Sequence, residues 1–238
     1  MDLGNSSSKQ GTSPTKMAED FAIDTISVKI ADLGNACWVN HHFTNDIQTR
    51  QYRSPEVILG AKWGASTDVW SMSCMVSTAL SPTITVTNTN QVFELITGDY
   101  LFDPQSGTKY GKDDDHIAQM IELLGVFPKT LATSGKWSQE IFNRKNELRN
   151  IHRLRHWALP DVLREKYHFG VQEAVRISEL LLPMLELLPS ERANAGGMAN
   201  HAFLEDTKGM EGKQLPIEVG TKGEAIEGWA TEIKKTKQ

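Results

Sequence analysis

One stretch, residues 28–56, constrains the fold of this chain more than any other. It opens with the apolar run Val28-Lys29-Ile30-Ala31, which favours a strand, and turns at once at Asp32-Leu33-Gly34. A long polar loop separates this turn from Ser54-Pro55-Glu56, which has the residue order of a helix start. A carboxylate at the end of a strand, beside a flexible glycine, suits a divalent cation that bridges phosphates. The stretch therefore predicts that Asp32 is a ligand for a divalent cation that bridges phosphates.

The composition limits the class of protein. The 238 residues are enough for one large domain or two small ones, and 39% of them are hydrophobic, as in ordinary globular chains. A net charge of −5 argues against a general nucleic-acid-binding role and favours a basic partner. No apolar run is long enough to span a bilayer, and the first residues lack a signal-peptide core, so no membrane role is predicted.

The cysteines and histidines do not form a metal-binding pattern. Cys37 and Cys74 have neither the spacing of a disulfide framework nor that of a zinc site, and they indicate a reducing compartment. His41 and His42 lie in the polar loop and His116 follows an acidic run, with no cysteine at ligand spacing. We therefore expect no zinc site.

Apolar periodicity and end signals predict a mainly helical chain after a short strand over residues 21–31. Pro55–Gly60 is predicted as a short helix, with Ser54 as N-cap, proline at the first position and glycine as the stop. A mostly apolar run that begins at Ser66 predicts a buried helix. Further helices are predicted over Asp113–Leu124, Trp137–Leu148, Leu159–Tyr167, Glu173–Leu187 and Ala193–Phe203.

The helix that begins at Ser66 is interrupted by an uncharged segment, residues 76–91, which is rich in Thr, Ser and Asn. Its β-branched residues and Pro82 make a poor helix interior. Removing it joins Met75 to Val92 and restores a continuous amphipathic helix. We interpret the segment as a retained intron, because its codons can supply donor, branch-point and acceptor strings. A genuine loop insertion is the alternative, and in either case the segment is expected outside the packed core.

Two strings inside residues 28–56 make the pattern specific: Asn35-Ala36-Cys37-Trp38 and Thr49-Arg50-Gln51-Tyr52-Arg53. With them, the stretch resembles the activation segment of the serine/arginine-protein kinase family, whose members phosphorylate Arg-Ser repeats of splicing factors. Asp32-Leu33-Gly34 stands at the Asp-Phe-Gly position and Ser54-Pro55-Glu56 at the Ala-Pro-Glu position.

The resemblance implies a fold and domain boundaries. It covers roughly residues 26–204 apart from the insertion, and it implies a mainly α fold: a kinase-like C-lobe with a vestigial β element and no N-lobe. The Gly-rich loop, the strand lysine and the catalytic loop that precede Asp-Phe-Gly in kinases have no counterpart in the sequence. We therefore expect a disordered, spacer-like N-terminus over residues 1–20, a partial kinase domain over 21–205 and a mobile tail over 206–238.

The resemblance also implies roles for single residues. Asp32 would ligate the magnesium ion that bridges the phosphates of ATP, while the catalytic aspartate is missing from the chain. Glu56 and Arg192 would form a bidentate pair, the alternative being two unrelated surface charges. Asp68, near the start of a buried helix, would accept hydrogen bonds from catalytic-loop amides. Without those donors it would be a destabilising buried carboxylate.

Two further groups of residues match the family's contacts with substrate. One group corresponds to an acidic docking groove for arginine-rich peptides, and it comprises Asp99, Asp115 and Glu122, with Trp157 and Lys166 lining the groove. The other corresponds to a basic strip that contacts phosphate, and it comprises Arg50, Arg53 and Lys112. A solvated side chain is the alternative for Lys112, and helix N-terminal acids are the alternative for Asp113 and Asp114.

Two functions from different classes follow from the resemblance. The first is a serine/threonine kinase that uses ATP and magnesium to phosphorylate Arg-Ser-rich proteins, here truncated and inactive alone. The second is a binding module that holds arginine-rich peptides without chemistry. In both cases the resemblance implies a monomer in the cytoplasm and nucleus, with no direct contact to nucleic acid or membrane.

Overall fold

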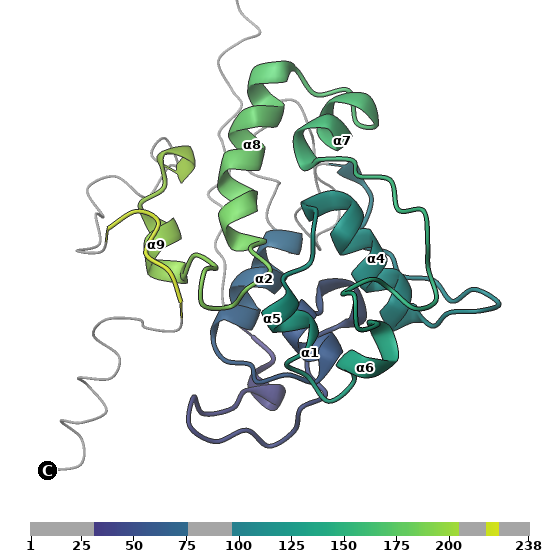
Figure 1. Ribbon diagram of the computed structural model, residues 1–238. Coiled ribbons are helices and arrows are strands. Elements are labelled where there is room, and N and C mark those ends of the chain that lie inside the picture. Colours follow the sequence, from purple (N-terminus) through teal and green to yellow (C-terminus); the bar gives the residue numbers. More distant parts are fainter. Residues whose placement is uncertain (1–30, 76–96, 205–217, 224–238) are drawn as a thin grey trace, which may run out of the picture. The chain divides into compact units, whose positions relative to one another are not determined.

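The computed structural model describes residues 31–75, 97–204 and 218–223 (Figure 1). The predicted strand up to residue 30, the segment 76–91, the N-terminal residues 1–20 and nearly all of the predicted tail lie outside the described residues. The chain divides into two compact units, residues 1–36 and residues 37–238. Each unit is described by itself.

In the first unit, the described residues form a turn around the Asp-Leu-Gly string. A 3-10 helix, η1 (Leu33–Asn35), follows Asp32, whose backbone is left-handed with φ 58° and ψ 56°. An aspartate tolerates this conformation better than most residues because its short polar side chain can hydrogen-bond locally. Every residue from 31 to 36 is exposed.

The regular secondary structure in the described residues of the second unit is helical. Its longer helices are α2 (Ser66–Met75), α4 (Lys112–Leu124), α7 (Leu159–Glu165) and α8 (Val171–Met184). The shorter ones are η2 (Arg50–Tyr52), α1 (Pro55–Leu59), α5 (Lys129–Ala132), α6 (Ser138–Ile141), α9 (Ala195–Ala199) and η3 (Ala202–Leu204). Extended pairing in the described residues is limited to three isolated bridges, and the predicted β element lies outside them.

Helix α1 follows its predicted bounds. Pro55 occupies the first turn, and Gly60 ends the helix with a left-handed backbone at φ 67°. Ser54 occupies the N-cap position, as predicted, but its side chain makes no capping hydrogen bond. Its hydroxyl donates instead to the side-chain oxygen of Gln48, at 3.2 Å, which also accepts from the Ser54 backbone N–H at 2.9 Å. The polar loop is thereby tied to the start of α1.

Helices α2 and α4 also form where the sequence predicted helices. Helix α2 begins at Ser66, as expected. Helix α4 begins one residue earlier than predicted, after Gly111, whose backbone N–H donates to the Asp114 side chain at 3.0 Å. Gly125 ends α4 and donates its N–H to the carbonyl of Ile121 at 2.9 Å.

The predicted helix over residues 137–148 is wrong. Only α6 forms there, and the chain then turns so that Phe142 and Leu148 pair in an isolated antiparallel bridge. The Asn143 side-chain oxygen accepts from the backbone N–H groups of Lys145, at 2.8 Å, and Glu147, at 3.1 Å. This side chain offers the backbone an alternative to helical hydrogen bonds.

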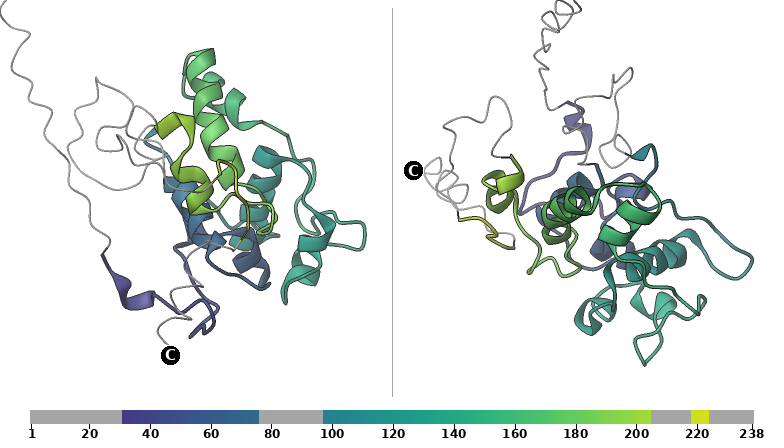
Figure 2. Two further views of the ribbon diagram at one scale, coloured as in Figure 1. Left: turned by 90° about the vertical axis from the view of Figure 1, so that its left-hand side faces the viewer. Right: turned by 90° about the horizontal axis from the view of Figure 1, so that it is seen from above.

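The core lies where α2, α4, α7 and α8 meet. Helix α8 packs against both α7 and α2, and Figure 2 shows these neighbours from two further sides. Fully buried side chains in this core include Trp70 of α2, Ile117 of α4 and Leu181 of α8. The indole of Trp70 stacks on Phe102 with ring centroids 6.0 Å apart. Helix α4 carries two side chains of the candidate site, Asp115 and Glu122.

Candidate functional site

A buried ion pair links two distant parts of the second unit. Arg192 donates from Nη1 to Glu56 Oε1 at 2.7 Å and from Nη2 to Glu56 Oε2 at 2.9 Å. Neither side chain has exposed surface. The predicted bidentate contact is therefore present, and the alternative of two unrelated surface charges is excluded.

Arg192 makes further hydrogen bonds that join three segments. Its Nη1 also donates to the carbonyl of Ser66 at 3.0 Å, and its Nε donates to the carbonyl of Glu186 at 2.9 Å. The guanidinium lies 5.0 Å from the centre of the Trp70 ring. One side chain thus connects α1, the first residue of α2 and the segment that follows α8.

Asp68 lies in the first turn of α2, as predicted, but its side chain is not buried. Its side chain is on the exposed face of α2, while Val69 and Trp70 beside it are buried. Met72, one helical turn later, is on the same exposed face. The expectation of a buried carboxylate is wrong, because the burial of α2 is confined to one side of the helix.

Asp32 is the one predicted metal ligand, and its chemistry fits a magnesium ion. Mg²⁺ at phosphoryl-transfer sites takes one or two carboxylates and completes its shell with phosphate oxygens and water. Asp32 is exposed and offers one carboxylate. In the described part of the chain, no three His, Cys, Asp or Glu side chains gather into a group that could hold a metal ion.

The predicted docking residues gather around one pocket. This docking pocket has a volume of ≈ 360 Å³ and lies between the residues that precede α4, α4 itself and the α7 region. Glu122, Trp157 and Lys166 line it directly. Asp115 and Asp99 do not line the pocket themselves, but each bonds to residues that do. Asp115 accepts from Gln119, and Asp99 pairs with Lys166 and Tyr167. The full lining also includes Tyr100, Leu101, Phe102, Gln119, Leu123, Arg155, Val162 and Tyr167.

The two carboxylates on α4 already hold neighbouring backbone and side chains. Asp115 accepts from the backbone N–H of Gln105 and from the side chain of Gln119, both at 2.8 Å. Glu122 accepts from the backbone N–H of Arg155 at 2.9 Å. Each carboxylate therefore fixes a loop at the edge of the pocket while keeping its negative charge close to it.

Asp99 belongs to a cluster of three polar side chains at the pocket. Its Oδ2 lies 2.8 Å from Lys166 Nζ and accepts from the Tyr167 hydroxyl at 3.0 Å. The hydrogen bond from Lys166, followed by that from Tyr167, lowers the pKa of Asp99. Burial alone would lower the pKa of Lys166, but its hydrogen bonds to Asp99 and Tyr167 outweigh burial, and the pKa is raised.

Aromatic rings form much of the remaining wall. The Trp157 indole N–H donates to Glu165 at 3.1 Å, and its backbone N–H donates to the carbonyl of Glu122 at 2.7 Å. The ring is held by these two bonds and is 37% exposed. Tyr100 is equally exposed. The pocket thus combines carboxylates with aromatic surface.

Two of the three predicted basic residues lie at a second pocket, of ≈ 720 Å³. Arg53 and Lys112 line it, and Arg53 donates to Asp46 at 2.9 Å and to the carbonyl of Gln48 at 3.0 Å. Arg50 does not line this pocket, and it pairs with Asp113 at the start of α4. Lys112 is exposed.

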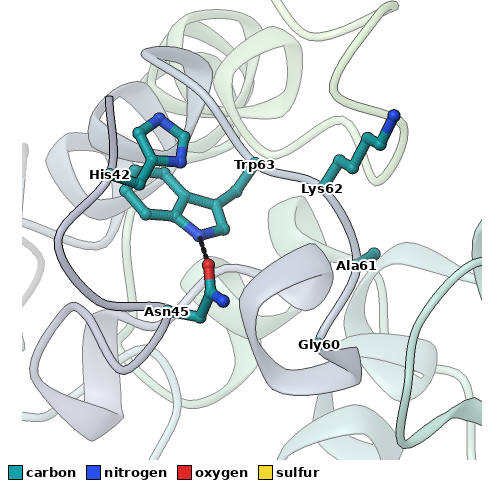
Figure 3. Close-up of a pocket in the computed structure, with 6 residues that line it drawn as sticks. All are labelled: His42, Asn45, Gly60, Ala61, Lys62 and Trp63. Atoms are coloured by element: carbon teal, nitrogen blue, oxygen red, sulfur yellow. Dashed lines mark hydrogen bonds between the residues drawn. The ribbon is translucent and has the colours of Figure 1, made fainter. Parts of the chain in front are cut away.

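A third pocket, of ≈ 400 Å³, joins the polar loop to the segment after α1 (Figure 3). The His42 ring stacks on Trp63 with centroids 3.7 Å apart and planes 10° apart. The Trp63 indole N–H donates to Asn45 at 3.1 Å, and Lys62 points away from the stacked rings. These contacts fix the loop rather than leave it free.

Two tyrosines of the docking pocket were not predicted from the sequence. Tyr167 and Tyr100 were not singled out, although both line the docking pocket. The signal available was their position next to Lys166 and Asp99 in the chain. Their contribution depends on bringing α4 and α7 together, which local sequence does not specify.

The sequence is similar to those of known protein kinases. The protein kinase domain family matches residues 18–204. The chain is 54% identical over 213 residues to protein kinase dsk1 of Schizosaccharomyces pombe, covering 89% of this chain and 36% of that protein. It is 51% identical over 214 residues to serine/threonine-protein kinase SKY1 of Saccharomyces cerevisiae, covering 90% and 27%. It is also 51% identical over 181 residues to human SRSF protein kinase 3, covering 76% and 29%.

The matched residues include both Glu56 and Arg192 and reach the end of η3. The chain therefore belongs to the protein kinase family and, within it, to the serine/arginine-protein kinases. It spans roughly a third of the length of the curated relatives that it matches, as the 36%, 27% and 29% coverages show. None of the helices in the described ranges is long and apolar enough to cross a membrane.

Proposed function

We propose that the chain is the substrate-binding part of a serine/threonine kinase that transfers phosphate from ATP to serines in Arg-Ser-rich proteins. The helical unit is its C-lobe, in which the Glu56–Arg192 pair ties the activation segment to the later helices. Membership of the family supports the reaction, and the relatives named above are kinases. A monomer in the cytoplasm and nucleus is part of the same proposal.

The observation that carries the proposed substrate is the docking pocket. A guanidinium group pairs with a carboxylate through two parallel hydrogen bonds and also stacks on aromatic rings. Glu122 and Trp157 offer these two kinds of surface in one pocket, with Asp115 and Asp99 beside it. The acidic net charge of −5 favours encounter with an arginine-rich peptide.

ATP and magnesium are the proposed cofactors, with Asp32 as a magnesium ligand. Its exposed carboxylate supports this role, because Mg²⁺ at phosphoryl-transfer sites takes carboxylate ligands. The sequence contains no His-Arg-Asp string for a catalytic loop. We therefore expect the chain by itself not to transfer phosphate.

The second candidate is a binding module that holds arginine-rich peptides without chemistry. It is favoured by one observation: the groups proposed to bind arginine all lie within this chain, whereas the catalytic string does not. Incubation with ATP and an Arg-Ser peptide tests the expected inactivity of the chain. Phosphate transfer that is abolished by Asp32→Ala would overturn the binding-only candidate and the expected inactivity.

Calorimetry with an arginine-rich peptide tests the docking proposal. Asp115→Asn combined with Glu122→Gln removes two charges but keeps the side-chain oxygens that accept from Gln105 and Arg155. We expect affinity to fall about tenfold, as for two partly exposed ion pairs, and to fall further with added salt.

The matched control is Glu173→Gln with Glu179→Gln, which changes the net charge equally on exposed positions of α8. This variant should bind within about twofold of the unchanged chain, since distant exposed charges are screened. Equal affinity of the pocket variant and the control would contradict the docking proposal.

A further inference from the structure

The docking pocket already holds a positive charge that belongs to the chain itself. Lys166 Nζ lies 2.8 Å from Asp99 Oδ2 and 4.7 Å from the centre of the Tyr167 ring. The Tyr167 hydroxyl donates to the same carboxylate oxygen. A carboxylate on one side and an aromatic ring on the other are the contacts that a cationic side chain of a peptide would also seek.

This internal contact is weak enough to exchange. The side chains of Lys166 and Asp99 keep 46% and 52% of their surface exposed, so the pair is strongly screened by water. Their hydrogen bond lowers the pKa of Asp99, and it contributes to raising the pKa of Lys166 against the effect of burial. Both groups are therefore charged near neutral pH, and the pair is intact before a peptide arrives.

We propose that Lys166 is an internal competitor that occupies Asp99 until an arginine side chain of the bound peptide displaces it. This inference rests on the proposed function, since it concerns the same docking pocket. An ammonium group is a point charge, whereas a guanidinium offers a planar fork to both carboxylate oxygens. Arginine therefore gains by the exchange, while an incoming lysine replaces one ammonium with another.

The change in peptide affinity when Lys166 is removed distinguishes a competitor from a residue that binds the peptide. If Lys166 contacts the bound peptide, as a residue that merely lines the groove would, its removal weakens binding. If Lys166 competes with the peptide, its removal strengthens binding. The free energy needed to release Lys166 does not depend on the incoming side chain, so the gain should be equal for arginine-rich and lysine-rich peptides.

The test is calorimetry of the full chain with two peptides that differ only in having arginine or lysine at each basic position. Lys166→Met keeps an apolar stem and removes the ammonium. We expect the association constants of both peptides to rise about three- to fivefold, the range of an exposed ion pair. Lys166→Arg retains a competing cation and should show no rise.

Two controls isolate the contact. Lys129→Met makes the same change of net charge at an exposed position of α5, outside the docking pocket, and should leave binding nearly unchanged. In an Asp99→Asn background, Lys166→Met should add no further gain, because the two residues then no longer interact.

The outcomes separate the two proposals. Binding by the unchanged chain with no gain, or a loss, in Lys166→Met overturns the competitor and leaves the docking proposal standing. An equal gain in Lys129→Met also overturns the competitor, because net charge would then explain the effect. Absence of peptide binding by the unchanged chain and by every variant overturns both proposals.

Discussion

Glu56 and Arg192, 136 positions apart in the sequence, form a two-bonded ion pair that has no exposed surface. The carboxylate lies in the first turn of α1, and the guanidinium comes from the segment between α8 and α9. Because Arg192 also donates to the carbonyls of Ser66 and Glu186, the pair fixes three segments at one point: α1, the start of α2 and the segment after α8. The end of the proposed activation segment is therefore held by the helical core.

Replacing this arginine with lysine should be strongly destabilising. Arg192→Lys keeps the charge but cannot bond both carboxylate oxygens and the surrounding carbonyls from one planar group. A hydrogen bond to a buried charged group contributes about 1.5–3 kcal/mol, and lysine leaves at least one of these bonds unmade. Urea denaturation followed by circular dichroism should show this loss in the free energy of unfolding.

Arg176→Lys provides the matched control, since Arg176 is exposed on α8. It should change the free energy of unfolding by about 0.5 kcal/mol or less. A loss of about that small size for Arg192→Lys as well would contradict the role given to the buried pair.

The helix bounds that the sequence predicted well are those set by local signals. Pro55 and Gly60 fix the ends of α1 through their own backbone preferences, and acidic residues after Gly111 mark the start of α4. Residues 137–148 failed because their apolar spacing fits a helix, yet the Asn143 side chain and the Phe142–Leu148 bridge favour a turn. Periodicity alone does not reveal that competition.

The turn after α6 should depend on the Asn143 side chain. Asn143→Ala removes the acceptor for the N–H groups of Lys145 and Glu147 and should lower the free energy of unfolding by about 1–2 kcal/mol. Asn143→Asp keeps an acceptor oxygen and should lose less. Thermal unfolding of both variants checks this order, and an equal loss would mean that the acceptor is not the reason for the turn.

In the candidate site, too, short strings predicted some residues, whereas other contacts depend on the packing of distant segments. The resemblance of the activation segment pointed to Glu56, Arg192 and the docking residues, because short strings mark their positions. The sequence did not reveal that the Asp99 carboxylate is already paired with Lys166 and Tyr167. Such pairing depends on how α7 lies against the residues before α4, which is a property of the packed fold.

The Asp68 carboxylate should have only a small effect on the stability of the chain. Its side chain is exposed on α2, so it is not the destabilising buried carboxylate that the sequence predicted. Asp68→Asn should change the free energy of unfolding by about 1 kcal/mol or less, the scale of a charge in the first turn of a helix. Chemical denaturation measures it, and a loss of several kcal/mol would mean that the carboxylate is structurally essential.

His116 is a fully buried side chain of α4 that faces the Phe102 ring at 5.3 Å. Among the described residues, neither of its ring nitrogens has a hydrogen-bond partner. Burial, followed by the charges of Arg50 and Arg53, lowers the pKa of His116 from 6.5 to about 3. The folded chain therefore holds a neutral imidazole in its core over most of the acidic pH range.

This buried imidazole should make stability fall as the solution becomes acidic. Above pH 6.5 the histidine is neutral in both states and contributes no pH dependence. Between that value and about 3, the unfolded chain binds a proton that the folded chain does not, so the free energy of unfolding decreases as pH falls. His116→Leu should flatten this slope and should be neutral or stabilising near neutral pH, because it removes unpaired polar atoms from the core. Urea denaturation at a series of pH values measures the slope, with exposed His152→Leu as the control that should leave it unchanged. An unaltered slope in His116→Leu would show that other groups cause the acid sensitivity.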